Sequence, residues 1–126
     1  MSVSNKRIGT EFEKRICNML NHDGWWVHFI EPKQSGAQPF DIIAVRHGRA
    51  VAIDCKTCVS ERFNIDRLED NQIFAFEKWM SCGNNEPYVI VEHEEDIYVI
   101  PYTYRRDNKS VKLEDLQWAR WGVLPV

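Results

Sequence analysis

Two aspartates and a lysine lie close together in the apolar stretch from Pro39 to Lys56. The stretch contains two runs of mainly aliphatic residues separated by a polar break at His47-Gly48, which predicts a β-hairpin with a two-residue loop. In that register Asp41 opposes Asp54, and Lys56 lies on the same face because side chains alternate with period two. A three-residue loop would shift the register and separate the two carboxylates.

Facing carboxylates beside a lysine are suited to chemistry on a phosphate. Like charges that are directly opposed destabilise a sheet, so the pair makes physical sense when a cation lies between Asp41 and Asp54. Oxygen ligands of this kind suit Mg²⁺ or Mn²⁺, and Lys56 would then polarise a water molecule or hold a phosphate oxygen. The alternative is that both aspartates are solvated at strand ends and Lys56 is an ordinary surface lysine. Geometry alone leaves both interpretations open.

Helices are predicted before and after the hairpin. Residues 5–21 carry an apolar stripe at helical spacing, made of Ile8, Phe12, Ile16, Met19 and Leu20. Glu13 and Glu11 lie near opposite edges of this stripe, and periodicity does not choose between them. A second helix, predicted from about residue 66 to residue 80, has Gln72 on its apolar face. A buried amide needs hydrogen-bond partners, which the backbone or a metal site would supply.

The order of these motifs resembles that of the PD-(D/E)xK nuclease superfamily. Asp41 matches the first aspartate of the superfamily, and Asp54-Cys55-Lys56 matches its (D/E)xK motif. The likeness covers residues 6–102 and is greatest to archaeal-type Holliday junction resolvases. It includes two upstream stretches, Gly9-Thr10-Glu11-Phe12-Glu13 and Gln34-Ser35-Gly36. Two departures, Phe40 directly before Asp41 and an aspartate where resolvases usually carry glutamate, leave the metal chemistry unchanged.

The resemblance implies a set of metal ligands. Asp41 and Asp54 would bind Mg²⁺ or Mn²⁺, with the main-chain carbonyl of Cys55 as a further protein ligand. The family pattern selects Glu13 rather than Glu11 to complete the acidic set, either directly or through water.

The resemblance also implies roles for residues around the metal. Lys56 would orient the attacking water or stabilise the reacting phosphate, and Gln72 would bond a metal-bound water or a ligand carboxylate. In the polar loop at 31–38, Ser35 would contact DNA near the metal. Lys33, in the same loop, would meet a phosphate.

The function that the resemblance implies is a metal-dependent DNA endonuclease, and in particular a Holliday junction resolvase. Such an enzyme would act as a homodimer, because two strands that are cut symmetrically need two sites. One alternative is a repair or restriction-type nuclease on ordinary duplex DNA. Another is a DNA-binding or interaction module that has kept the fold and lost catalysis. The intact Asp41, Asp54 and Lys56 argue against the second alternative.

The composition is that of a soluble globular chain. With 126 residues, of which 44% are hydrophobic and 28% charged, residues 1–126 are expected to form a single nuclease domain. The net charge of −3 differs from that of a typical basic DNA-binding domain, so phosphate contacts would come from local groups such as Arg105 and Arg106 in a basic loop predicted at 105–112. The chain has neither an apolar run long enough to span a membrane nor a signal peptide, so we expect a cytoplasmic protein.

The cysteines are expected to be reduced thiols, because the N-terminus does not indicate secretion. Cys55 and Cys58 have the C-x-x-C spacing of a zinc site but lack a second pair of ligands. Cys55 would also point to the sheet face opposite Asp54 and pack in the core.

The predicted element order is α-β-β-β-α-β-β, which is typical of an α/β fold with a mixed β-sheet flanked by helices. Besides the hairpin, strands are predicted at 25–30, 88–92 and 97–102. A polar connector is predicted at 57–64 and a short helix at 113–121. The apolar residues at this end are expected to cap the core rather than to build a dimer contact; they are Trp118, Trp121 and Leu124.

Overall fold

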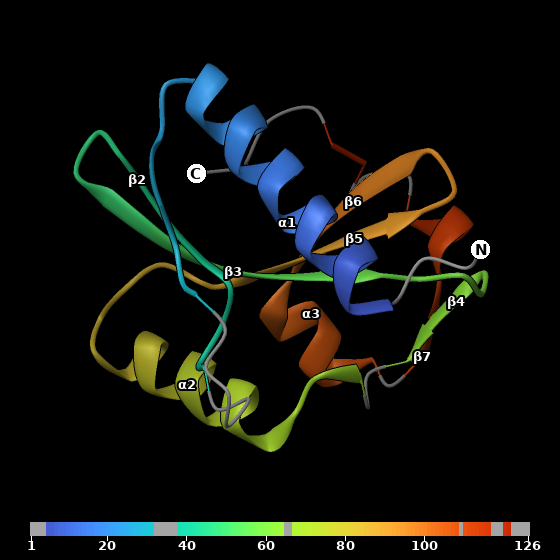
Figure 1. Ribbon diagram of the computed structural model, residues 1–126. Coiled ribbons are helices and arrows are strands. Elements are labelled where there is room, and N and C mark those ends of the chain that lie inside the picture. The colour runs from blue at the N-terminus through green and yellow to red at the C-terminus, as the bar shows by residue number, and fades with distance from the viewer. Residues whose placement is uncertain (1–4, 32–37, 65–66, 109, 117–119, 122–126) are drawn as a thin grey trace.

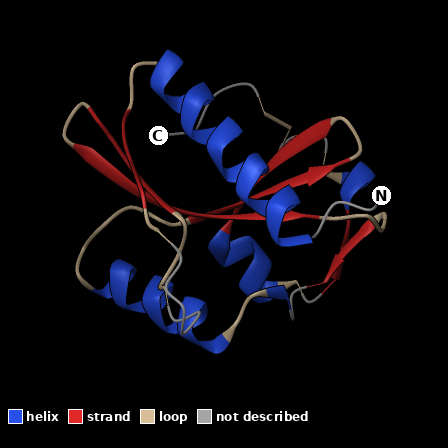
Figure 2. Ribbon diagram, in the orientation of Figure 1, coloured by secondary structure: helices blue, strands red, loops and turns tan. Residues whose placement is uncertain are grey.

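The computed structural model describes residues 5–31, 38–64, 67–108, 110–116 and 120–121 (Figure 1). A five-stranded sheet with the order β1-β2-β3-β5-β6 crosses the middle of the molecule (Figure 2). Strands β3 and β5 are parallel, and the other neighbouring pairs are antiparallel. The strands are β1 (Trp26–Phe29), β2 (Ile42–Arg46), β3 (Arg49–Thr57), β5 (Tyr88–His93) and β6 (Asp96–Pro101). The predicted fold class, a mixed sheet flanked by helices, is confirmed.

Helices cover both faces of this sheet. Helix α1 (Asn5–His22) lies on one face, and α2 (Asp70–Ser81) and α3 (Tyr102–Asp107) lie on the other (Figure 1). Each face has its own apolar core. Phe12, Ile16 and Leu20 of α1 belong to the first core, and Phe76 and Tyr102 belong to the second.

The β2–β3 hairpin has the predicted two-residue loop. Arg46 pairs with Arg49 and Ile42 pairs with Ile53, which is the expected register. His47 and Gly48 adopt φ angles of 51° and 74°. Two successive positive φ angles are what a type I′ turn requires, and the twist of this turn matches that of the flanking strands. The loop therefore fixes the strand register on which the spacing of the acidic residues depends.

Helix α1 matches its predicted range to within one residue. Phe12, Ile16 and Leu20 of the predicted stripe are fully buried, whereas Met19 is half-buried and Ile8 is exposed. Ile8, the first residue of the predicted stripe, is therefore not part of the core. None of the helices in the described residues is long and apolar enough to cross a membrane.

Three elements differ from the prediction. The connector expected at 57–64 contains strand β4 (Arg62–Asn64), which pairs with β7 (Ser110–Lys112) in a second, two-stranded sheet. The prediction of a basic loop at 105–112 is wrong, because residues 105–107 belong to α3 and residues 110–112 form β7. Both strands are short, and each forms only against a partner that is remote in sequence.

The helix predicted at 113–121 is limited, within the described residues, to the 3-10 helix η2 (Leu113–Asp115). Further on, Arg120 forms a bridge with Tyr98, and the Trp121 N–H donates to the carbonyl of Ile97. Trp121 packs against the core on the α1 side, as expected. The similar expectations for Trp118 and Leu124 lie outside the described residues.

Candidate active site

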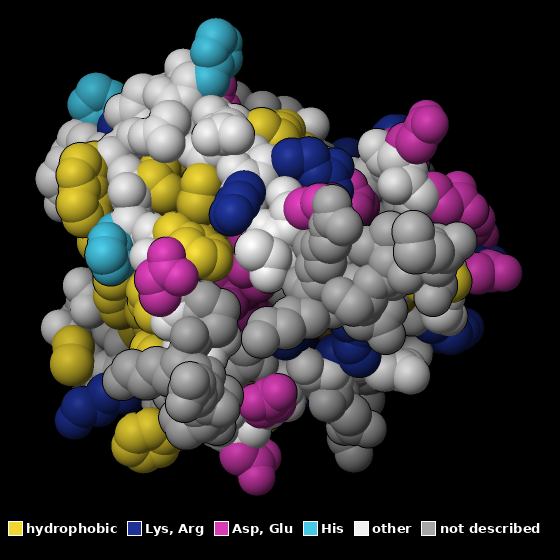
Figure 3. All heavy atoms as spheres, viewed as in Figure 1, with side chains coloured by type: hydrophobic (Ala, Val, Ile, Leu, Met, Phe, Trp, Pro, Cys, Tyr) yellow, Lys and Arg dark blue, Asp and Glu magenta, His cyan; other side chains and the backbone are white. Residues whose placement is uncertain are grey.

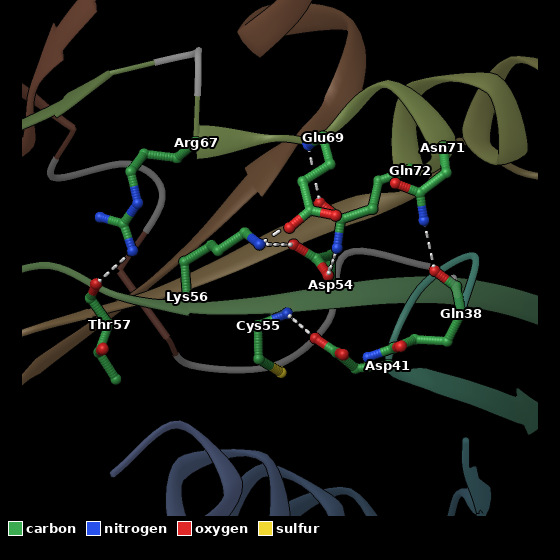
Figure 4. Close-up of polar contacts among 10 residues, drawn as sticks. All are labelled: Gln38, Asp41, Asp54, Cys55, Lys56, Thr57, Arg67, Glu69, Asn71 and Gln72. Carbon is green, nitrogen blue, oxygen red and sulfur yellow. Dashed lines mark hydrogen bonds and ion pairs between the residues drawn. The ribbon is translucent and has the colours of Figure 1, made fainter. Parts of the chain in front are cut away.

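Three of the predicted residues converge on one side of β3 (Figure 4). Asp54 is completely buried, and its Oδ1 accepts a 2.8 Å hydrogen bond from Gln72 Nε2 on α2. The Lys56 Nζ lies 3.2 Å from Asp54 Oδ2 and 3.4 Å from Gln72 Oε1. Asp54 and Lys56 share this face because they are two residues apart in a strand.

Gln72 is held by the start of its own helix. Helix α2 begins at Asp70, four residues later than predicted, and the backbone N–H of Glu69 donates to Gln72 Oε1 at 3.0 Å. This contact belongs to a capping box, which satisfies backbone N–H groups that a helix start leaves without intrahelical partners. Because Gln72 Oε1 faces donors, its Nε2 faces the Asp54 carboxylate. The predicted contact of Gln72 with a candidate ligand carboxylate is therefore present.

Asp41 lies where β2 separates from β3. Its N–H donates to the Ile53 carbonyl at 3.0 Å, while its own carbonyl accepts from Ile30 N–H at 2.8 Å, so its backbone contacts the strands on both sides. The ladder ends one residue later, at Ile42. The Asp41 Oδ2 accepts a 2.7 Å hydrogen bond from the Cys55 backbone N–H (Figure 4). This carboxylate thus takes the place of the backbone acceptor that a longer β2 would offer.

Glu13 approaches this point from α1. It is half-buried, unlike the exposed Glu11, so the predicted choice between the two agrees with their exposure. The pKa of Glu13 is raised from its usual 4.5 to about 7, mainly by burial and also by the Asp41 charge, while Lys56 opposes the shift. Glu13 therefore belongs to the same electrostatic cluster as Asp41 and Lys56, although α1 lies on the opposite side of the sheet from Gln72.

A negative charge on Asp54 is disfavoured in the protein without a bound cation. Burial raises the pKa of its carboxyl well above the usual range, and the neighbouring Asp41 charge adds to this effect while Lys56 opposes it. The contact of Asp54 Oδ2 with Lys56 has the distance of an ion pair but not the alignment of a hydrogen bond, and no other described residue donates to this oxygen. A buried carboxylate oxygen without a hydrogen-bond donor is a suitable ligand for a cation.

The donor set fits a magnesium-like ion rather than a soft metal. Among the described residues, no three His, Cys, Asp or Glu side chains form a group that could hold a metal ion by themselves. Mg²⁺ usually takes only one or two carboxylates and completes its octahedron with waters and substrate phosphates. Asp41 and Asp54 match that requirement. The N–H and C=O of a strand residue point to the same side, so the Cys55 carbonyl faces the gap beyond the end of β2.

The cysteines provide no zinc site. Cys55 packs in the core beneath α1, whereas Cys58 packs in the core on the other face of the sheet. Burial raises the pKa of the Cys55 thiol well above its usual range, which keeps that thiol protonated. All four cysteines are free thiols, as expected.

The remaining predicted residues are not brought to this cluster by the described structure. Ser35 and Lys33 lie outside the described residues. Arg105 and Arg106 belong to α3, and Arg106 forms ion pairs with Glu77 at 3.4 Å and Asp107 at 3.6 Å. Their contact with DNA stays a prediction.

Sequence patterns missed one residue that supports the site. Asn71 Nδ2 on α2 donates to the Gln38 carbonyl at 2.8 Å, which fixes the chain three residues before Asp41 (Figure 4). Neither residue belongs to a motif, and 33 residues separate them in the sequence. A local signal for this contact does not exist.

Comparison with known proteins gives one family. The model of the archaeal Holliday junction resolvase (Hjc) family matches residues 4–119. The crossover junction endodeoxyribonuclease Hjc of Methanocaldococcus jannaschii is 22% identical over 110 residues, which are 86% of this chain and 77% of that protein.

Solved structures with the same fold include Hjc of Archaeoglobus fulgidus, which is described as a Holliday junction resolvase. Its TM-score is 0.66 and its sequence identity is 18%, and the match covers 90% of this chain and 93% of that chain. The bacterial homing endonuclease I-Ssp6803I follows with a TM-score of 0.60 and 16% identity over 87% of this chain and 75% of that chain. At these sequence identities, the structural similarity shows only that the fold is shared. The family model, by contrast, spans most of the sequence and includes every residue of the acidic cluster. The chain therefore belongs to the family of archaeal Holliday junction resolvases.

Proposed function

We propose that this chain is a metal-dependent endonuclease, with one nuclease domain in residues 1–126, that hydrolyses phosphodiester bonds at four-way DNA junctions. The observation that carries the proposal is the buried Asp54 carboxylate. One of its oxygens is held by Gln72, and the other is left without an aligned donor beside Lys56. Such an arrangement destabilises the metal-free fold, which makes sense if the site is built for a ligand rather than for stability.

The ion would be Mg²⁺ or Mn²⁺. Asp41 and Asp54 would hold it, with the Cys55 carbonyl as a third protein ligand and Glu13 as a ligand directly or through water. When bound, the ion would supply Lewis-acid chemistry at the phosphodiester and lower the pKa of the attacking water.

The residues around the ligands would position the reacting groups. Lys56 is partly buried, and its ammonium is directed by Asp54 and Gln72. From there it would orient the water or stabilise the charge that develops on the phosphate. Gln72 would act through Asp54, whose orientation it fixes, and is therefore a positioning residue. The raised pKa of Glu13 means that metal binding and proton release are coupled.

Binding of DNA would depend on local basic groups. Among the described residues on the face seen in Figure 3, Lys and Arg side chains are scattered among Asp and Glu and form no single basic surface. This agrees with the net charge of −3. We propose Ser35, Lys33, Arg105 and Arg106 as substrate contacts, and a homodimer as the active form because symmetric cutting of two strands needs two sites.

The test compares a four-way junction with a linear duplex of the same sequence, both incubated with purified protein and Mg²⁺. We expect the junction to be cut and the duplex to be left largely intact. Cutting of both substrates at equal rates would instead assign the chain to a nuclease of ordinary duplex DNA. Absence of cutting on either substrate, with junction binding retained, would leave only a DNA-binding module.

A further inference from the structure

A cavity of about 510 Å³ opens directly beside the candidate active site. It starts at Lys56 and continues past the end of β3 toward β4. Its polar lining consists of Lys56, Thr57, Ser60, Arg62, Asn64 and Arg67. Lys56 therefore belongs to both the candidate active site and the cavity, since its ammonium lies 3.2 Å from Asp54 while its side chain borders the cavity.

The charge of this cavity has one sign. Three of its described lining residues are cationic, namely Lys56, Arg62 and Arg67, and none is Asp or Glu. Arg62 also stands directly opposite Lys112 in the β4–β7 ladder. Opposed like charges destabilise a sheet. The Lys112 ammonium is neutralised by Glu114 at 2.7 Å, whereas Arg62, which is exposed, projects its charge at the rim of the cavity.

Arg67 is already oriented for a ligand. Its Nη2 donates to the Thr57 carbonyl at 2.9 Å, and its guanidinium lies over the Phe63 ring, 5.9 Å from the centroid. Figure 4 shows Arg67 reaching back to the end of β3, on the same side of the strand as Lys56. A guanidinium has five N–H donors in a planar fork that suits phosphate oxygens. A side chain fixed in this way loses little further entropy when it binds.

We propose that this cavity is a second phosphate subsite, which holds a backbone phosphate adjacent to the one that is cut. Arg67 would be its main ligand, with Arg62 at the rim. A DNA strand with one phosphate at Asp41 and Asp54 would meet this cavity if it continues past Lys56, because the cavity is the cationic space that Lys56 borders. The subsite would fix the position of the cut along the strand. This inference rests on the proposed function.

The test neutralises single phosphates of the DNA and single arginines of the protein. Junctions carry one methylphosphonate at each of three positions on either side of the cut in the cleaved strand, and binding is measured in EDTA so that nothing is cut. We expect one methylphosphonate position at which wild-type binding weakens while binding by Arg67→Ala does not weaken further. That pattern is the non-additivity of two groups in contact.

Further variants exclude a folding defect. Arg67 also contacts Thr57 and Phe63, so Arg67→Lys, which keeps the charge, and Arg62→Ala, whose side chain is exposed, are tested beside it. Each alanine variant should lower the slope of log affinity against log salt by about 1, because one phosphate contact is lost. Arg49→Ala is the matched control, since this exposed arginine at the start of β3 does not line the cavity.

Additive effects of Arg67→Ala and of the methylphosphonate at every position would overturn the subsite. The proposed function would still stand if the wild type cuts unmodified junctions with Mg²⁺. Conversely, a protein that shows the coupling in EDTA but does not cut would retain Arg67 as a phosphate ligand and lose the proposed function.

Discussion

Gln72 and Asp54 are joined by a 2.8 Å hydrogen bond from the side-chain amide to the buried carboxylate, across the interface between α2 and β3. Gln72 Oε1 meanwhile accepts the backbone N–H of Glu69. One side chain thus caps a helix and orients a candidate metal ligand, so that the position of α2 and the geometry of the site are linked.

Gln72→Ala should reduce both stability and cleavage. The change leaves a buried acceptor unpaired, which costs roughly 1–3 kcal/mol, and the loss of a partner that orients a ligand lowers activity about 10–100-fold. Denaturant unfolding in EDTA and single-turnover cleavage with Mg²⁺ measure the two effects. Asn71→Ala is the matched control, because this neighbouring amide bonds Gln38 and does not contact Asp54. A Gln72→Ala variant that cuts at the rate of the Asn71→Ala variant would contradict a positioning role.

Lys56→Ala should abolish cleavage and spare junction binding. A residue that orients the water or stabilises developing charge is worth about 10²–10⁴ in rate, whereas one lysine among several basic groups adds little to affinity. A gel shift beside a cleavage assay separates the two effects, with the exposed Lys14→Ala as control. A loss of only about tenfold in rate would be too small for a group at the reacting centre.

The stability of the metal-free protein should fall as pH rises. The pKa of Glu13 is raised from 4.5 to about 7, so the folded protein keeps a proton that the unfolded chain releases between these values. The free energy of unfolding therefore decreases through this window and stays low above pH 7. The raised pKa of Asp54 acts in the same direction. Denaturation midpoints from pH 5.5 to 8 in EDTA measure the effect, and Glu13→Gln should flatten the curve. A free energy of unfolding that rises with pH over this range would contradict the raised pKa of Glu13 in the folded protein.

Local sequence signals were sufficient where local geometry decides the structure. His47-Gly48 predicts the hairpin and its register because positive φ angles are demanded at two adjacent residues. The α1 stripe predicts its helix because Phe12, Ile16 and Leu20 lie on one face. Asp54 and Lys56 share a face of β3 because they are two residues apart in that strand, so this part of the site also follows from the local sequence.

Other parts depend on contacts between residues that are far apart in the chain. Helix α3 begins after Pro101, and the N–H of its second residue, Thr103, donates to the Glu86 carboxylate at 2.7 Å. This N-terminal cap comes from 17 residues upstream, so no pattern within the helix reveals it. Strands β4 and β7 are three residues each and form only with each other. The same limit applies to Asp41, whose bond to Cys55 exists because β2 stops early.

Asp54→Asn should stabilise the metal-free protein while weakening its response to metal. The change removes a buried charge that the Asp41 charge disfavours and keeps the shape of the side chain, which should raise the free energy of unfolding in EDTA by on the order of 1 kcal/mol. Mg²⁺ should raise the melting midpoint of the wild type, because a ligand that binds only the folded state stabilises it. It should raise that of the mutant less. A mutant that melts lower in EDTA and gains as much from Mg²⁺ as the wild type would show that the aspartates share no ion.

The most direct measurement is the single-turnover rate at which the protein cuts a four-way junction, taken for the wild type, Asp41→Asn and Asp54→Asn in Mg²⁺ and in EDTA. A shared metal site that performs the cut predicts cleavage by the wild type in Mg²⁺ alone. It also predicts that each mutant loses about 10²-fold or more in rate, as removal of a charge-stabilising group does, while still binding the junction. Cleavage by the wild type in EDTA, or by either mutant in Mg²⁺ at the wild-type rate, would contradict the assignment of the active site to these two aspartates.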